Sequence, residues 1–168
     1  MTEIYTVNRR WGELKGIPKK EAYAIGIRKI GDALKWCRDA NVEILTMWGF
    51  STDNFTRDKT EISDLFELFK HNLKEALESD DKNRYEVRVR FLGRLHLFPR
   101  EVQEMMKKAE EISAKNTKNT LNLLLAYGGR EEIITACKQL IEEAKDGRLS
   151  IDDIDEALFS NHLYTKDL

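Results

Sequence analysis

Basic side chains gather near the N-terminus of this 168-residue sequence, in Asn8-Arg9-Arg10-Trp11 and then in Lys15, Lys19 and Lys20. An arginine guanidinium pairs with two phosphate oxygens at once, and a nearby helix N-terminus adds backbone N–H donors. The segment could therefore bind a phosphate group. Taken by itself, it is better explained as a solvated basic surface.

Two further polar segments each follow an apolar stretch of the chain. Residues 51–57 (STDNFTR) come directly after the apolar residues 42–50, and residues 127–130 (YGGR) come after the apolar residues 120–126. Helix capping explains some hydroxyl groups of the first segment, but not Asn54 or Arg57. The paired glycines of the second segment permit a tight turn or a close approach of a ligand to the backbone, and both uses stay open.

The spacing of apolar residues predicts helices that alternate with strands. Apolar residues three and four apart predict helices over residues 19–37, 61–77, 99–112 and 131–145. Apolar or alternating stretches predict strands over residues 42–50, 85–92 and 120–126. Strands that alternate with long helices favour a parallel sheet, so we expect an α/β fold in which a single layer of mainly parallel strands is flanked by helices.

Turn and cap residues mark the ends of several of these elements. Residues 80–83 are typical of a charged turn, and Gly147 is expected to end the helix that precedes it. Ser150, with Asp153 three residues later, is expected to cap a last short helix.

A binding site is expected where the strands end. Open parallel sheets bind ligands beyond the C-terminal ends of their strands, so the early and middle loops would form a cationic rim there. The helix over residues 61–77 has a wide apolar stripe that includes Leu65, Leu68 and Phe69. Such a stripe usually packs in the core, but it could also line an elongated apolar pocket. The combination would suit a substrate with a charged head and a hydrocarbon tail.

The composition restricts other kinds of partner and location. A net charge of −2 gives no overall attraction to nucleic acid or to an acidic membrane. No segment approaches the roughly 18 apolar residues of a membrane span, and the N-terminus lacks the pattern of a secretory signal. Cys37 and Cys137 lie in apolar helical patterns, which indicates reduced core residues, and the three histidines lack metal-ligand spacing. We expect a cytoplasmic protein whose residues 1–168 form a single domain.

Five segments, in order along the chain, resemble motifs of the cis-prenyltransferase family, which includes undecaprenyl and polyprenyl diphosphate synthases. They are residues 8–11 (NRRW), 50–57 (FSTDNFTR), 87–93 (VRVRFLG), 121–133 (LNLLLAYGGREEI) and 162–165 (HLYT). Enzymes of this family condense isopentenyl diphosphate repeatedly onto an allylic diphosphate, with new double bonds cis. The resemblance implies a prenyltransferase of isoprenoid biosynthesis whose substrates are isoprenoid diphosphates.

The resemblance also implies roles for individual residues. The substrate-binding set would be Arg9, Arg10, Trp11, Lys19, Tyr23 and Arg57, with Tyr23 beside the leaving group. The catalytic set would be Asn8, Ser51 and Asn54, of which the last two would orient the second substrate or remove its proton. The wall of the product tunnel would contain Gly49, Leu65, Leu68 and Phe69. Tyr23 could instead only pack, and Ser51 could only bond the backbone of its loop.

Two positions depart from the family pattern. Thr6 stands where the family has a magnesium-binding aspartate, and a hydroxyl is a poor ligand for that hard cation. The chain stops at residues 166–168, before the family's Arg-x-Ser-Gly-Glu segment. The resemblance thus implies a chain truncated at both ends, with Mg²⁺ as a cofactor whose ligands are largely missing. It also implies a homodimer and peripheral membrane association through the lipid product.

Three functions follow as hypotheses. The first is a prenyltransferase, or the bulk of one. The second is a non-catalytic homologue or subunit that pairs with an active prenyltransferase, which Thr6 favours. The third is a nucleic-acid-binding module built on residues 8–20 and on Arg88 and Arg90; the overall charge and the lack of interleaved aromatic residues oppose it.

Overall fold

The computed structural model describes residues 4–78 and 86–166, and for residues 4–9 it describes the backbone. Its strands are β1 (Ile44–Ser51), β2 (Val87–Leu92) and β3 (Asn119–Tyr127). Its helices are α1 (Ile4–Lys15), α2 (Lys19–Asp39), α3 (Lys59–Glu78), α4 (Arg100–Ser113), α5 (Gly129–Lys145) and α6 (Glu156–Ser160). The strands lie in the order β1-β3-β2 and all pair in parallel, which confirms the expected α/β fold.

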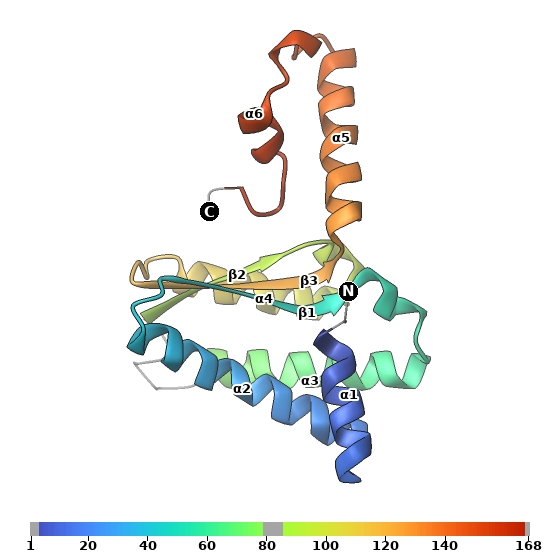
Figure 1. Ribbon diagram of the computed structural model, residues 1–168, viewed down its shortest axis with the longest axis vertical. Helices are drawn as coiled ribbons and strands as arrows, with labels where there is room; N and C mark the ends of the chain where they lie inside the picture. The colour runs from blue at the N-terminus through green and yellow to red at the C-terminus, as the bar shows by residue number, and fades with distance from the viewer. Residues whose placement is uncertain (1–3, 79–85, 167–168) are drawn as a thin grey trace.

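The helices are arranged unevenly around this sheet (Figure 1). Both α2 and α3 lie under one face, and α4 lies beside β2. The helix α5 runs away from the sheet, and α6 packs beside α5.

Side chains of α4 cover the outer edge of β2. Ser113 Oγ accepts a hydrogen bond from the Val89 backbone N–H at 3.0 Å. Glu110 Oε1 accepts one from the Phe91 N–H at 2.7 Å. An edge strand exposes unpaired backbone groups to other chains. These contacts provide acceptors for two backbone N–H groups of that edge and hold α4 in place.

An aromatic cluster fills the core between the sheet and α3. Phe50, which is 1% exposed, lies at its centre. Its ring centroid is 5.0 Å from that of Phe55, 5.6 Å from that of Phe98 and 6.4 Å from that of Phe69. Edge-to-face contacts of this kind add to the free energy of apolar burial. They fix the C-terminal end of β1, from which the polar loop departs.

The basic segment over residues 8–11, expected in a loop, belongs to helix α1. Tertiary packing favours this helix: a Cβ added to Gly12 would lie 2.7 Å from the Ala22 Cβ of α2. The two backbones approach so closely there that only glycine fits. Local sequence patterns do not contain this contact, which joins two different helices.

The predicted helix ends are confirmed in part. Gly147 has a φ of +70° and its N–H donates to the Ala144 carbonyl at 3.1 Å, so it ends α5 as expected. Ser150 caps only the 3-10 helix Ile151–Asp153. The cap of α6 is Asp155, whose Oδ1 accepts from the Leu158 N–H at 2.7 Å. The predicted turn over residues 80–83 lies outside the described residues.

The two cysteines differ in burial. Both are free thiols; Cys37 is half-buried, whereas Cys137 is exposed. The prediction of a core position was therefore wrong for Cys137. Its helix, α5, extends away from the sheet, so an apolar pattern along it has no sheet to pack against (Figure 1).

Candidate functional site

A cavity of about 640 Å³ lies between the sheet and the helices α2 and α3. Tyr23, Asn54 and Arg57 line it near the C-terminal end of β1, and Val87 and Leu121 line it near the N-terminal ends of β2 and β3. It therefore follows the length of the strands. Its volume falls within the roughly 300–1,000 Å³ typical of ligand pockets.

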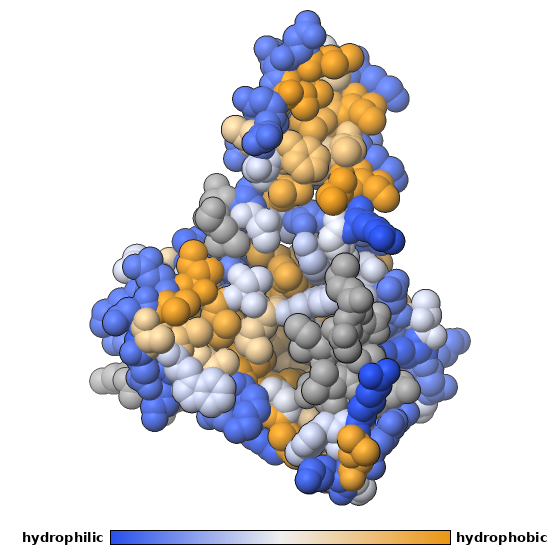
Figure 2. Space-filling view, viewed as in Figure 1, coloured by the Kyte–Doolittle hydropathy of each residue, from blue (hydrophilic) through white to orange (hydrophobic). Residues whose placement is uncertain are grey.

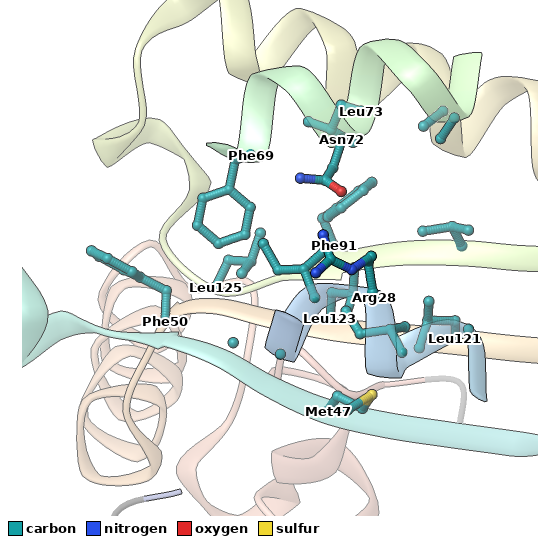
Figure 3. Close-up of a pocket in the computed structure, with 18 of the residues that line it drawn as sticks. Arg28, Met47, Phe50, Phe69, Asn72, Leu73, Phe91, Leu121, Leu123 and Leu125 are labelled. Atoms are coloured by element: carbon teal, nitrogen blue, oxygen red, sulfur yellow. The ribbon is translucent and has the colours of Figure 1, made fainter. Parts of the chain in front are cut away.

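The wall of this cavity is mainly apolar. Figure 3 shows side chains of the strands on one side and of α3 on the other, all directed into the same space. From the strands come Met47, Phe50, Phe91, Leu121, Leu123 and Leu125, and from α3 come Phe69 and Leu73. Such a lining suits a hydrocarbon, because burying apolar surface is favourable and needs no directional contact.

A network of charged and hydroxyl groups lies at the Arg57 end, which we call the mouth of the cavity. Arg57 Nη1 donates to Glu61 Oε1 at 2.8 Å and to the Tyr23 hydroxyl oxygen at 2.9 Å. The Tyr23 hydroxyl in turn donates to Glu61 Oε1 at 3.0 Å. Lys19 Nζ lies 3.5 Å from Glu61 Oε2. Three segments of the chain thus bring two cations to one place.

This network shifts two pKa values. Burial raises the pKa of the Glu61 carboxyl, but the hydrogen bond from Tyr23 and the charges of Arg57 and Lys19 outweigh it, so the pKa lies below its ordinary value. The pKa of Tyr23 is raised, first by burial and then by Glu61, although Arg57 opposes this. At neutral pH the mouth therefore carries an ionised Glu61 and a protonated Tyr23 hydroxyl.

The loop after β1 is held by its own side chains. Ser51 Oγ accepts from the Asp53 N–H at 3.1 Å, and Asn54 Oδ1 accepts from the Ser51 N–H at 3.2 Å. This reciprocal pattern is a capping box on the 3-10 helix Thr52–Thr56. Ser51 is 3% exposed and Asn54 4%. Both side chains are thus fixed by backbone contacts, and Asn54 also lines the cavity.

The segment after β3 lies against the loop after β1. A Cβ added to Gly128 would come 3.3 Å from Thr52 Oγ1, so the absence of a side chain allows this close approach. The Tyr127 hydroxyl donates to Glu132 Oε2 at 2.7 Å, and Arg130 is exposed. The two polar segments that the sequence places after strands therefore meet at one edge of the sheet, as expected for parallel strands.

The residues predicted for the tunnel divide into two groups. Gly49, Leu65 and Phe69 line the cavity. Leu68 does not: it is 9% exposed and packs in the hydrophobic core. Three of the four residues thus line the cavity and Leu68 packs beside it in the core, whereas their contact with a product stays a prediction.

The residues predicted to bind the charged head are also divided. Tyr23, Lys19 and Arg57 come together in the network at the mouth. Arg10 and Trp11 are exposed on α1, and no residue of α1 lies among the described residues that line the cavity. Asn8 and Arg9 belong to the part of α1 whose backbone alone is described.

Sequence reasoning missed Glu61, which joins the whole network. A signal existed, because Glu61 follows Arg57 by four residues, and oppositely charged residues at this spacing often pair on a helix. The contacts of Glu61 with α2 had no such signal. Arg28 and Asn72, which also line the cavity, were missed because only apolar residues were considered for its wall.

The described residues do not fit a magnesium site. No group of three or more His, Cys, Asp or Glu side chains that could hold a metal occurs among them. The carboxylate nearest the mouth, Glu61, is already bound to Arg57, Tyr23 and Lys19. No step below is therefore assigned to a metal ion.

No helix within the described residues is long and apolar enough to cross a membrane.

Known proteins resemble this chain over most of its length. The family model described as "Putative undecaprenyl diphosphate synthase" matches residues 4–168. A tritrans,polycis-undecaprenyl-diphosphate synthase (geranylgeranyl-diphosphate specific) of Methanocaldococcus jannaschii is 40% identical over 161 residues, which are 96% of this chain and 58% of that protein. The synthase of the same name from Pyrococcus abyssi is 36% identical over 96% of this chain and 61% of its own length.

A solved structure has the same fold. The lavandulyl diphosphate synthase of Lavandula x intermedia, in complex with dimethylallyl diphosphate, matches with a TM-score of 0.87 at 28% identity, over 96% of this chain and 69% of that chain. This chain spans about three fifths of the length of the curated relatives named above, 58% and 61%. The family model, the relatives and the fold agree: the chain belongs to the undecaprenyl diphosphate synthase family, that is, to the cis-prenyltransferases.

Proposed function

We propose that this chain forms the part of a cis-prenyltransferase that binds the allylic diphosphate and its hydrocarbon tail. The enzyme would condense isopentenyl diphosphate onto that substrate. The relatives are synthases of polycis-undecaprenyl diphosphate, and the fold match is to a protein in complex with an allylic diphosphate. Both agree with a substrate that has a charged head and an apolar tail.

One observation carries the proposal: a mainly apolar cavity ends at a mouth where Arg57 and Lys19 converge on Glu61. The side chain of Arg57 is 15% exposed and lines the cavity. A diphosphate bound there would pair with Arg57 in a two-pronged way, while its tail entered the cavity.

The residues at the mouth would lower the barrier by stabilising charge. In the reaction, the allylic C–O bond breaks and its electrons leave with the diphosphate, while the double bond of isopentenyl diphosphate forms the new C–C bond and a proton is lost. Arg57 and Lys19 would hold the departing diphosphate, and the Tyr23 hydroxyl would donate to one of its oxygens. Groups fixed in advance stabilise such charge without reorganisation.

The remaining predicted residues complete the proposed site. Ser51 and Asn54, whose loop is fixed, would orient isopentenyl diphosphate or take part in removing its proton. Binding of the diphosphate by the α1 residues Asn8, Arg9, Arg10 and Trp11 stays a prediction from the resemblance. Gly49, Leu65 and Phe69 would contact the tail, and Leu68 would support them from the core.

Three further properties stay predictions from the resemblance. They are a dependence on Mg²⁺, a cytoplasmic location and a homodimer. The free thiols Cys37 and Cys137 agree with a reducing compartment. The exposed side chains of Ile133, Ile134 and Ile141 on α5 agree with a protein contact; Figure 2 shows apolar surface over this part of the molecule. Gel filtration with light scattering tests the dimer.

Binding of geranylgeranyl diphosphate, followed by calorimetry, tests the proposed function. Arg57→Met should weaken binding at least tenfold, because the tail keeps its cavity while the head loses its principal partner. Arg100→Met is the matched control, since Arg100 is exposed on α4 and pairs with Glu104 there. An equal affinity in both variants would refute the proposed mouth.

A second candidate is a binding protein or subunit without catalysis. Thr6, which stands where the resemblance places a magnesium-binding aspartate, is the feature that favours it. Labelled isopentenyl diphosphate, added with geranylgeranyl diphosphate and Mg²⁺, separates the two readings. Extension of the prenyl tail favours the enzyme. Binding without extension favours the subunit, provided that a full-length homologue restores the extension.

A further inference from the structure

Two polar side chains interrupt the otherwise apolar middle of the cavity wall. Arg28 comes from α2 and Asn72 from α3. Figure 3 shows both side chains directed into the cavity from their separate helices. The other polar residues that line it lie at the mouth or towards the opposite end, where Arg38 and Glu75 are exposed.

Their depth follows from their helices. Arg28 lies five residues after Tyr23, which at 1.5 Å per residue is about 7.5 Å along α2 from the mouth. Asn72 lies eleven residues after Glu61, or about 16 Å along α3. A tail that enters at Arg57 would therefore meet Arg28 before Asn72, and both before the end formed by Leu77 and Val87.

The immediate surroundings leave Arg28 unconstrained. In the part of the chain whose side chains are described, Arg28 takes part in no hydrogen bond or ion pair. A Cβ built on Gly31, one helical turn later, meets no atom within 4 Å, so there is open space beside it. Asn72 is fixed instead, because its Nδ2 donates to the Leu68 carbonyl at 2.7 Å.

A hydrocarbon tail in this cavity would displace water from Arg28. Arg28 is exposed in the free protein, so its guanidinium is hydrated. A hydrocarbon tail packed past it would remove that water and offer no hydrogen bond in return, which is costly for a charged group. The part of the tail placed before Arg28 gains fully from burial, whereas for the part that passes it the lost hydration of Arg28 opposes that gain.

We propose that Arg28, together with Asn72, sets the length of the hydrocarbon tail that this cavity binds. The inference rests on the proposed function, because it takes the tail to enter from the Arg57 end. It assigns the limit to polar groups in the middle of the wall, well before the end of the cavity.

The test is a series of allylic diphosphates that differ in tail length, titrated against the same chain. For the unaltered chain, affinity should rise about tenfold or more with each early five-carbon unit and then level off. Arg28→Met keeps a long apolar stem but no charge. In this variant the affinity should level off at a tail that is longer by at least one five-carbon unit. The longest tail should bind at least tenfold more tightly.

Lys29→Met is the matched control, because it removes the same charge from the next residue. Lys29 is exposed and pairs with Asp32 at 2.6 Å on the solvent side of α2. Asn72→Leu is a second variant that should also favour longer tails. Thermal melting of each variant verifies that it is folded.

The outcomes separate this inference from the proposed function. Length profiles of Arg28→Met and Asn72→Leu that coincide with the unaltered one would overturn the inference alone, as would an equal shift in Lys29→Met. A loss of inorganic diphosphate affinity in Arg28→Met would place this residue in the head site and also overturn it. Failure of the unaltered chain to bind any member of the series would overturn both.

Discussion

Arg57 Nη1 donates to Glu61 Oε1 at 2.8 Å, in a pair whose side chains are only 15% and 13% exposed. The cation best placed to bind a diphosphate therefore has a counter-ion in the free protein. Without it, a half-buried guanidinium would pay a desolvation cost that nothing offsets. A bound diphosphate would compete with Glu61 for the same donor.

Replacing Glu61 should therefore strengthen the binding of small anions. Glu61→Gln keeps an oxygen that accepts from Arg57 and Tyr23 but removes the negative charge. The cluster of Lys19, Arg57 and residue 61 then gains one unit of positive charge. We expect inorganic diphosphate to bind several-fold more tightly, measured by calorimetry at low ionic strength, where screening is weak.

Asp64→Asn gives the control for this change. Asp64 lies on the same helix, is exposed and pairs with Lys20 at 3.4 Å. The substitution has the same effect on net charge but acts at a screened surface, so diphosphate affinity should hardly change. Weaker binding in Glu61→Gln would mean that Glu61 acts by positioning Arg57 rather than by competing for it.

The same carboxyl makes stability depend on pH. The pKa of Glu61 in the folded chain lies below its ordinary value of 4.5. A depressed pKa stabilises the fold above the ordinary value, and this contribution is lost as pH falls through the folded-state pKa. Urea unfolding should therefore show Glu61→Gln to be less stable by about 1 kcal/mol at neutral pH. The difference should shrink as the pH falls below 4.5 and through the folded-state pKa. A difference that is constant with pH would contradict this assignment.

Tyr127 should show the opposite dependence. Burial, followed by the hydrogen bond to Glu132, raises the pKa of Tyr127 from 10.0 to about 12. A raised pKa stabilises the fold fully below 10.0, and this stability is lost as pH rises towards 12. Spectrophotometric titration should show a transition near pH 12 that loses the amplitude of one tyrosine in Tyr127→Phe. An unchanged amplitude in Tyr127→Phe would exclude Tyr127 as a source of this transition.

The elements of this fold were predictable because their signals are local. The apolar spacing over residues 61–77 predicted the helix Lys59–Glu78, and the stretch over residues 42–50 predicted the strand Ile44–Ser51. Helix α1 was not predictable, since its packing depends on Gly12 meeting Ala22 of another helix. Local periodicity reports which face of a helix is apolar, but not which neighbour it will contact.

The candidate site was predictable only in part for the same reason. The sequence located Arg57 and Asn54 at the end of a strand, but the role of Glu61 depends on contacts with Tyr23 and Lys19 that lie about 40 positions away in the sequence. The rotation of α3 about its axis was also unknown. Leu65 and Phe69 differ by about 40° around a helix and share the cavity, whereas Leu68 differs from Leu65 by about 60° in the other direction.

This rotation gives a sharp test with two leucines. Leu65 is 8% exposed and lines the cavity, and Leu68 is 9% exposed and lies in the core beside it. Substitution of either by alanine should lower the free energy of unfolding by about 2–4 kcal/mol, since both delete buried methyl groups.

The affinity for ligands should distinguish the two alanine variants. Leu65→Ala removes tail contacts and should weaken geranylgeranyl diphosphate several-fold without changing the affinity for inorganic diphosphate. Leu68→Ala should leave both affinities as they were. Equal losses of tail affinity would mean that the tail follows a path other than the cavity between the sheet and α3.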